Sequence, residues 1–119
     1  MKASTKLDIA ARTPPGWYGL ATPPGWDTIV EQLFLKLVAV YPDLEVYQIK
    51  EKFGGLRFYT NKDAEGPARA LTNAAEAEAW RTCQRCGAAG AEQIVAWEES
   101  VGPGSGWVST LCKECASDE

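Results

Sequence analysis

Four cysteines in the C-terminal third of the chain are the residues whose type and spacing best indicate chemistry. They form two C-x2-C pairs, Cys83 with Cys86 and Cys112 with Cys115, and 25 residues separate the pairs. Two residues between cysteines let both thiolates reach one ion from a single turn, and two such turns complete the tetrahedral four-sulfur shell of a structural zinc site. The sequence therefore predicts one structural Zn²⁺ per chain.

Two disulfides, or a redox or iron–sulfur centre, are the alternative uses of these cysteines. The N-terminal stretch MKASTKLDIAARTPPG has no apolar core of a secretory signal, and no apolar run approaches the roughly 20 residues of a membrane helix. We therefore expect a cytoplasmic protein that does not insert into a membrane. In the reducing cytoplasm, cysteines bind metal more often than they form disulfides.

The residue inventory does not favour an enzyme. Four cysteine ligands close the metal shell, whereas a catalytic zinc keeps an open position for water. The chain contains no histidine, which removes the commonest general base and any Ser-His or Cys-His pair. Glu98 and Glu99 fall on an expected strand, where adjacent side chains point to opposite faces. We expect a non-enzymatic protein.

A second cluster of chemically active side chains lies in the stretch QIKEKFGGLRFYTN, residues 48–61. Its apolar residues alternate, which is typical of a strand, and Gly54-Gly55 is a plausible two-residue turn. We therefore expect a hairpin over residues 45–61. One face would be apolar, and the other would carry Lys52 opposite Arg57 and Lys50 opposite Tyr59. A longer turn would shift this register but would still place Lys50 next to Arg57.

These three cations allow two interpretations. Like charges opposite each other in a sheet are destabilising, so something negative must lie close to them. It is either an internal carboxylate, for which the candidates are Glu45, Glu51, Glu76 and Glu78, or a phosphate or carboxylate of a ligand. Arg57 would offer such a ligand a planar fork, Tyr59 could stack on a base, and the amides of Gly54 and Gly55 could approach an anion.

The remaining elements are read from periodicity and from residues that start or end helices. A helix is expected over 28–41, because apolar residues recur every three or four positions, after the N-cap Asp27 and before Pro42. A second helix should begin at Asp63 or Glu65, reach about Thr82 and lead into Cys83. The segments EQIVAW and GWVSTL are expected strands, joined through VGPGSG.

The sequence thus predicts an α+β fold with an N-terminal helix packed on a β-hairpin, and a second helix leading into a zinc-ribbon-like hairpin. We expect a flexible arm over residues 1–24, an α-β-β-α core over 25–82 and a four-cysteine subdomain over 83–119, all in one compact domain. The arm contains PPGW twice, ending at Trp17 and Trp26. Both tryptophans are expected to cover the edge of the core, or Trp17 is exposed and anchors a partner.

Four stretches together resemble a family of small uncharacterised proteins encoded in bacteriophages and prophages. They are GWDTIVEQL, QIKEKFGGLRFY, the helix running into RTCQRCGAAG, and GWVSTLCKEC, within residues 25–115. Many relatives have histidine at the position of Cys115, and the first PPGW is extra to this chain. The resemblance implies a phage-encoded protein in the cytoplasm of a bacterial host, but no activity. By analogy, small phage proteins often bind a host protein, and some inhibit host defence as anti-CRISPR proteins do.

Three hypotheses for function follow. The first is a zinc-containing interaction protein that binds a host protein, with or without inhibiting it. The second is a binder of a phosphorylated small molecule or signalling nucleotide on the basic hairpin, and the third is a nucleic-acid-binding zinc ribbon. The net charge of −4 and a pI near 4.9 argue against general DNA binding. The sequence does not predict the oligomeric state.

Overall fold

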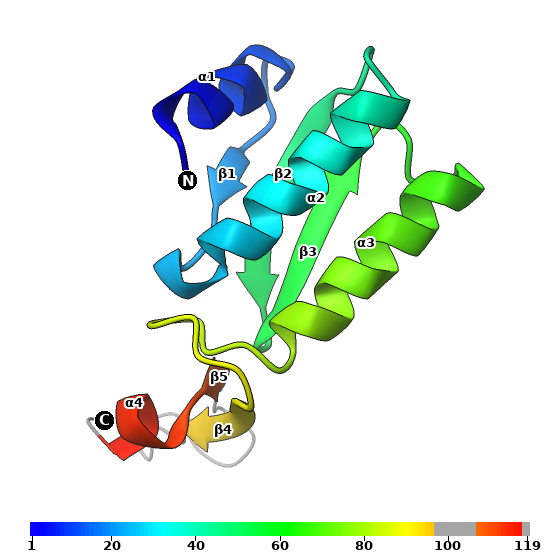
Figure 1. The fold of residues 1–119 in the computed structure, drawn as a ribbon. Helices are drawn as coiled ribbons and strands as arrows, with labels where there is room; N and C mark the ends of the chain where they lie inside the picture. The colour runs from blue at the N-terminus through cyan, green and yellow to red at the C-terminus, as the bar shows by residue number, and fades with distance from the viewer. Residues whose placement is uncertain (97–106, 118–119) are drawn as a thin grey trace.

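The computed structural model of this α+β protein describes residues 1–96 and 107–117 (Figure 1). In chain order, its elements are α1 (Ala3–Ala11), β1 (Gly19–Ala21), the 3-10 helix η1 (Pro24–Trp26), α2 (Asp27–Val40), β2 (Val46–Lys52), β3 (Gly55–Thr60), α3 (Gly66–Ala79), β4 (Glu92–Ala96), β5 (Trp107–Leu111) and α4 (Lys113–Ser117). Glu98, Glu99 and the expected loop VGPGSG lie outside the described residues.

Two sheets organise these elements. The first has the order β1-β2-β3, with β1 parallel to β2 and β2 antiparallel to β3. Helices α2 and α3 lie side by side across one face of this sheet (Figure 1). The antiparallel pair β4-β5 lies beyond the end of the sheet where β2 turns into β3, and α4 follows it. This order confirms the predicted fold class.

Helix α2 confirms the helix expected over residues 28–41. Its N-terminal residue is Asp27, which was expected just outside as the cap. Positions three and four apart place one face of the helix in the core, and the buried residues are Ile29, Val30, Leu33, Phe34 and Leu37. Helix α3 packs beside α2 with a narrow line of buried alanines, Ala68, Ala75 and Ala79, whose small side chains allow the two helices to approach closely.

The hairpin expected over residues 45–61 is present, but its predicted Gly54-Gly55 turn is wrong. Lys52 pairs with Gly55, so the two turn residues are Phe53 and Gly54. Their φ angles are +54° and +81°, the left-handed values that a tight hairpin turn requires. Glycine takes this conformation freely, whereas it costs another residue about 1–2 kcal/mol. The sequence therefore suggested two glycines for a turn that uses one glycine and a phenylalanine.

The observed register separates the two faces of the hairpin. Ile49 pairs with Phe58, and both side chains are buried under the helices. The next pair, Lys50 opposite Arg57, therefore points to the other side. The expected pairing of Lys52 with Arg57 is wrong, because the turn begins one residue earlier than predicted, but Lys50 and Arg57 are neighbours as expected. We call the side of the sheet opposite α2 and α3 the open face.

A bulge at the start of β2 adds to the open face. The register shifts between Val46 and Gln48, and both Val46 and Ile49 are fully buried although they are three residues apart. A regular strand sends residues three apart to opposite faces. The bulge therefore turns both Tyr47 and Gln48 away from the core. Gln48 lies opposite Tyr59 on the open face.

Residues 1–24 do not form the loose arm expected from the sequence. Residues 3–11 form α1, which buries Thr5 and Ile9, and Gly19–Ala21 adds a parallel strand to β2. Only these two α1 residues, four apart, face the core, which is too sparse a pattern to read as an amphipathic helix. The prediction failed because long-range contacts hold this segment.

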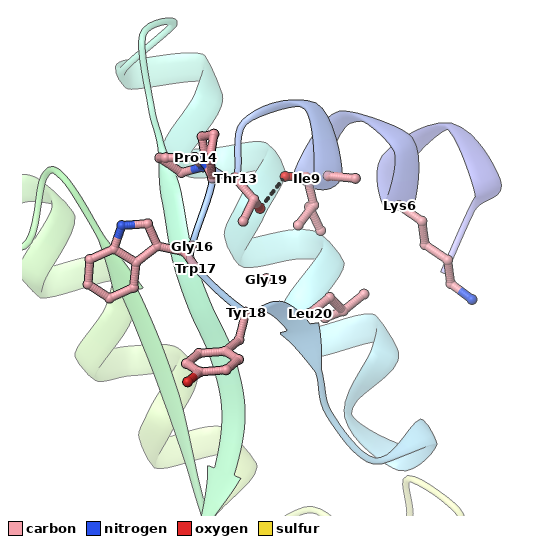
Figure 2. A pocket seen from close by; sticks show the side chains of 11 residues that line it. Lys6, Ile9, Thr13, Pro14, Gly16, Trp17, Tyr18, Gly19 and Leu20 are labelled. Atoms are coloured by element: carbon pink, nitrogen blue, oxygen red, sulfur yellow. Dashed lines mark hydrogen bonds between the residues drawn. The ribbon is translucent and has the colours of Figure 1, made fainter.

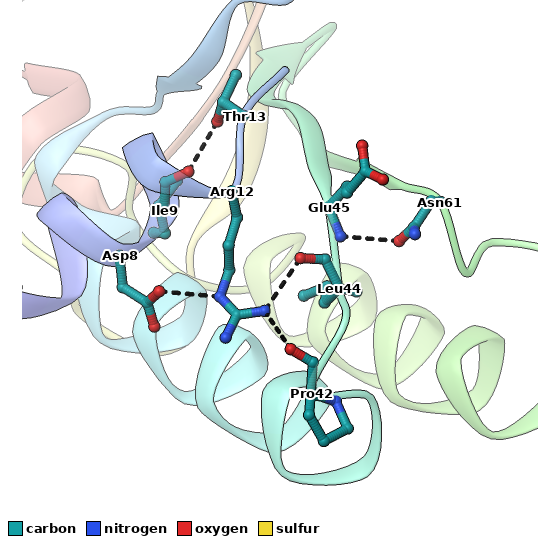
Figure 3. A network of polar contacts seen from close by, with 8 residues as sticks. All are labelled: Asp8, Ile9, Arg12, Thr13, Pro42, Leu44, Glu45 and Asn61. Carbon is teal, nitrogen blue, oxygen red and sulfur yellow. Dashed lines mark hydrogen bonds and ion pairs between the residues drawn. The ribbon is translucent and has the colours of Figure 1, made fainter.

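Arg12 makes several of these contacts (Figure 3). Its Nε donates to Asp8 at 2.9 Å, and one guanidinium nitrogen donates to the carbonyl oxygens of Pro42 and Leu44 at 2.8 and 3.0 Å. The backbone amide of Val46 donates to the carbonyl oxygen of Arg12 at 2.9 Å. Arg12 therefore ties the end of α1 to the loop between α2 and β2.

The helices of the described residues are all too short or too polar to cross a membrane.

Candidate metal centre and open face

The four cysteines come together, as their spacing predicts. Their sulfur atoms all lie within 4.8 Å of one another, and the sulfurs of Cys86 and Cys112 are 3.6 Å apart. In a tetrahedral site with zinc–sulfur bonds of about 2.3 Å, sulfur atoms are about 3.8 Å apart. A cluster of this size and composition could hold one metal ion. Cys83 is fully buried, whereas Cys86 lies at the surface.

Backbone hydrogen bonds shape the turn that carries the first pair. The amide of Gly87 donates to the carbonyl oxygen of Cys83 at 2.8 Å, and the amide of Cys83 donates to the carbonyl oxygen of Ala88 at 2.9 Å. Gly87 has φ +81°, so a glycine suits this position. In the second pair, the amide of Cys115 points at the sulfur of Cys112, 3.5 Å away, at the start of α4.

The thiols of the cluster have opposed tendencies to ionise. Burial works to raise the pKa of Cys83, but hydrogen bonds with the backbone of Cys86, Cys112 and Arg85 outweigh it and lower the pKa to about 6. Hydrogen bonds with the thiols of Cys112 and Cys83 raise the pKa of Cys115 to about 12. One thiolate therefore forms readily and makes the next harder to form. A bound divalent cation would remove this conflict, because it deprotonates the thiols that coordinate it.

The second PPGW copy anchors this centre to the core. The indole of Trp26 is fully buried, and its N–H donates to the carbonyl oxygen of Thr82, next to the first ligand, at 2.9 Å. The amide of Gly25 donates to the carbonyl oxygen of Gln84, also at 2.9 Å. A Cβ on Gly25 would lie 2.1 Å from the carbonyl oxygen of Cys83, so only glycine fits here.

Thr110 connects the metal centre to the hairpin turn. Its hydroxyl donates to the carbonyl oxygen of Gly54 at 2.6 Å. Its amide donates to the side-chain oxygen of Gln84 at 3.1 Å, and its carbonyl oxygen accepts from the amide of Gln84 at 2.9 Å. Gln84 follows the ligand Cys83, and Thr110 comes two residues before Cys112. The turn of the basic hairpin is thus one hydrogen bond away from Thr110, which hydrogen-bonds to Gln84 beside Cys83 and lies two residues before Cys112.

On the open face, the two lysines are not neutralised by the carboxylates proposed from the sequence. Among the described residues, no ion pair or side-chain hydrogen bond involves Lys50 or Lys52. Glu51 is used elsewhere, because its carboxylate accepts from the amide of Gly54 at 2.7 Å. Lys52 instead lies over the ring of Phe53, with its ammonium nitrogen 5.7 Å from the ring centre.

Arg57 differs from the two lysines. It lies at the sheet edge, where its guanidinium donates to the carbonyl oxygen of Leu56 at 3.3 Å and lines a hollow together with Glu76 and Trp80. Burial raises the pKa of Glu76, and the charge of Arg57 acts against that rise. Glu76 is therefore an internal carboxylate near Arg57, although no ion pair within 4.0 Å joins them. The charge of Arg57 is partly used by the fold.

The structure leaves little room for the expected role of the two glycines as anion contacts. Gly54 and Gly55 are both buried, and the Gly54 amide is occupied by Glu51. A Cβ on Gly54 would lie 3.0 Å from Val108 and 3.1 Å from Thr110. Close packing of the turn against β5 explains this glycine.

Three aromatic side chains extend the open face beyond Tyr59. Trp17, which is 52% exposed, stacks on Tyr47 with ring centres 4.6 Å apart. Figure 2 shows Trp17 beside Tyr18, with both rings directed away from α2. Phe53 is 64% exposed at the turn. The sequence patterns pointed to Trp17 but not to Tyr47 or Phe53. An exposed aromatic in the turn KFGG was the available signal for Phe53.

The fold and the cysteine cluster thus define an α+β protein with a zinc-ribbon-like arrangement of four cysteines that could hold one metal ion. Comparisons of the chain with protein-family models, curated proteins and solved structures found no match.

Proposed function

We propose that the protein is a non-enzymatic interaction protein in which a structural zinc ion fixes the C-terminal hairpin and the open face binds a negatively charged partner. The observation that carries the proposal is that Lys50 and Lys52 have no carboxylate partner in the described structure, while Lys50 lies opposite Arg57. Such a pair of like charges destabilises a sheet. The arrangement therefore favours an anion that comes from outside.

The resemblance to phage-encoded proteins extends this proposal. On that basis, the protein is a phage product that acts in the cytoplasm of a bacterial host, and its partner is a component of that host, such as a defence protein. Trp17 supports an interaction role, because its ring is half exposed and tryptophan is enriched where binding energy concentrates. A phosphorylated small molecule is the alternative ligand of the same face.

The test compares fold stability with partner capture. The double variant Lys50→Ala/Lys52→Ala should melt at or slightly above the wild-type temperature and should lose a host component that the wild type captures from bacterial lysate. Lys36→Ala removes an exposed cation from α2, outside the open face, and should change neither quantity. Double-variant protein that melts lower but captures normally would show that the lysines serve the fold, and the proposal would fail.

Two readings on the purified protein complete this test. Elemental analysis should find one zinc per chain, because the four sulfur atoms match the dimensions of a single zinc shell. Absorbance near 260 nm separates the alternatives for the partner. If this absorbance exceeds what the protein itself accounts for, and a small molecule that phosphatase degrades causes the excess, the phosphorylated ligand is favoured over a macromolecule.

A further inference from the structure

We infer that the open face binds single-stranded nucleic acid, with bases stacked on its aromatic rings and phosphates held by Lys50 and Lys52. The inference rests on the proposed function, because it specifies the chemistry of the ligand at that same face. Four features carry it: the exposed rings, their spacing, the unpaired cations and the backbone of Phe53.

The exposed rings are the first feature. Cations alone would suit any anion, but this face also presents flat apolar rings to water. Tyr59 is 40% exposed beside the Lys50–Arg57 pair, Phe53 is 64% exposed at the turn, and Trp17 is 52% exposed near the far end of β2. Every base has a π-face that can stack on such rings, whatever its sequence. Rings combined with cations therefore match a ligand that has both bases and phosphates.

The spacing of these side chains selects a single strand over a duplex. Tyr59 lies opposite Gln48, and Phe53 lies five residues further along the chain from Gln48, which is about 16 Å at the rise of a strand. Successive stacked bases of one DNA strand are separated by about 3.4 Å. A strand that spans this face must therefore be unstacked, with its bases free to reach the rings. Single strands allow this and a duplex does not.

The cations lie where the phosphates of such a strand would pass. Lys50 lies at the middle of the hairpin, between Tyr59 and the turn, and Lys52 stands over the ring of Phe53. A cation beside a ring can hold the phosphate of a nucleotide whose base stacks on that ring. Glu51, between the two lysines in sequence, is bonded to the turn amide and adds no repulsion beside them.

Phe53 supplies the fourth feature. Its φ of +54° is unfavourable for a residue with a Cβ, and its ring is largely exposed, so the fold gains little from a phenylalanine here. Asparagine or glycine would suit the turn better. Strained backbone that brings no stability is common where a side chain serves binding. An exposed ring at the turn is what a stacking site requires.

The experiment measures fluorescence anisotropy with labelled oligothymidylate of about 15 nucleotides, a length that fits single-strand sites. Wild-type protein should bind it more tightly than thymidine monophosphate and than a duplex of equal length, in about 50 mM salt. Tyr59→Leu should weaken binding about fivefold or more, whereas Tyr59→Phe should retain it, because stacking needs only the ring. Lys50→Gln should weaken binding and make it less dependent on salt.

Two control variants test whether the effect is local. Leu35→Ala and Lys36→Ala alter an exposed apolar residue and a cation on α2, across the sheet from the open face, and should leave the affinity unchanged. Thermal melting of each variant shows whether it is folded. Equal losses in the controls, or equal affinity for oligothymidylate and duplex, would overturn the inference.

Failure of this inference is distinguishable from failure of the proposed function. If oligothymidylate does not bind, but nuclease-treated lysate yields a partner that needs Lys50 and Lys52, the ligand is an acidic protein surface and only the nucleic-acid inference is wrong. Binding of thymidine monophosphate as tightly as of the oligomer would point to a free nucleotide and would equally overturn it. If the wild-type protein neither binds oligothymidylate nor captures a partner that needs Lys50 and Lys52, both proposals fail.

Discussion

The indole N–H of Trp26 donates a hydrogen bond to the carbonyl oxygen of Thr82, 56 residues further along the chain, at a distance of 2.9 Å. It joins the start of α2 to the residue that precedes the first metal ligand. Trp26 is fully buried, so without this bond the carbonyl group would lose its partner inside the protein.

We predict that Trp26→Phe lowers the free energy of unfolding by about 1–3 kcal/mol, the usual cost of leaving one buried polar group without a partner. It should also speed the loss of zinc to a chelator. Trp17→Phe is a matched control, because it changes the same residue of the other PPGW copy, where the ring is half exposed. Denaturant unfolding and chelator kinetics measure both effects. Equal effects of the two variants would contradict the anchoring role of Trp26.

Gly25→Ala should be far more damaging than Gly16→Ala. The new methyl group of Gly25→Ala would collide with backbone atoms of Cys83 and Gln84, whereas a Cβ on Gly16 meets nothing within 4 Å. Gly16 has φ +90°, so alanine there should cost only the strain of that backbone, about 1–2 kcal/mol. We expect Gly25→Ala to lose zinc or fail to fold, as judged by elemental analysis and circular dichroism.

Metal removal should loosen the C-terminal part first. Cys112→Ser removes one thiolate, and structural zinc supplies folding energy directly. Hydrogen exchange should rise most over residues 83–96 and 107–115, whereas the buried face of α2 should keep its protection because its core does not include the cluster. If reduced, freshly purified wild-type protein contains no zinc, the identity of the metal is wrong.

Phe53→Asn should raise the free energy of unfolding or leave it unchanged. Asparagine tolerates a left-handed backbone better than phenylalanine does, so the gain should be up to about 1 kcal/mol. Lys52→Ala removes the cation over the same ring and is the control for loss of the cation–ring contact. A clear fall in the melting temperature of Phe53→Asn would mean that the ring serves the fold.

Random duplex DNA should bind weakly or not at all at physiological salt. The net charge is −4, and the open face has three cations, which can neutralise only a few phosphates. Filter binding at two salt concentrations measures this. A submicromolar dissociation constant with steep salt dependence would instead support a zinc ribbon that binds DNA generally.

Sequence patterns correctly predicted the features that depend on residues close together in the chain. The apolar spacing in α2 and the C-x2-C spacing of the cysteines each report on a single element or turn, and the structure has both. The proximity of Lys50 and Arg57 was also predictable. The two residues are neighbours in the expected register, with Lys52 opposite Arg57, and in the observed one, with Lys50 opposite Arg57. The Phe53-Gly54 turn was not predictable, because Phe53 has a positive φ that phenylalanine rarely adopts.

The two PPGW copies show why the rest could not be read from the sequence. In both copies the tryptophan amide donates to the carbonyl oxygen of the first proline, but Gly16 of the first copy has φ +90°. In the second, the same letters form η1 and lead into α2. Contacts with residues 82–84 distinguish the copies, and those contacts come from a distant part of the chain. The same limit applies to α1, which Arg12 and Ile9 hold in place.

The bond between Thr110 and Gly54 links the cysteine cluster to the turn that presents Phe53. If metal binding fixes β5 and a ligand at the open face fixes the turn, each event favours the same arrangement of Thr110. Thermodynamic reciprocity then requires that zinc raise the affinity for the ligand by the same factor by which the ligand raises the affinity for zinc. A protein of this design would bind its partner less tightly in a zinc-starved cell, so the supply of a trace metal would set the strength of an interaction whose surface contains no metal ligand.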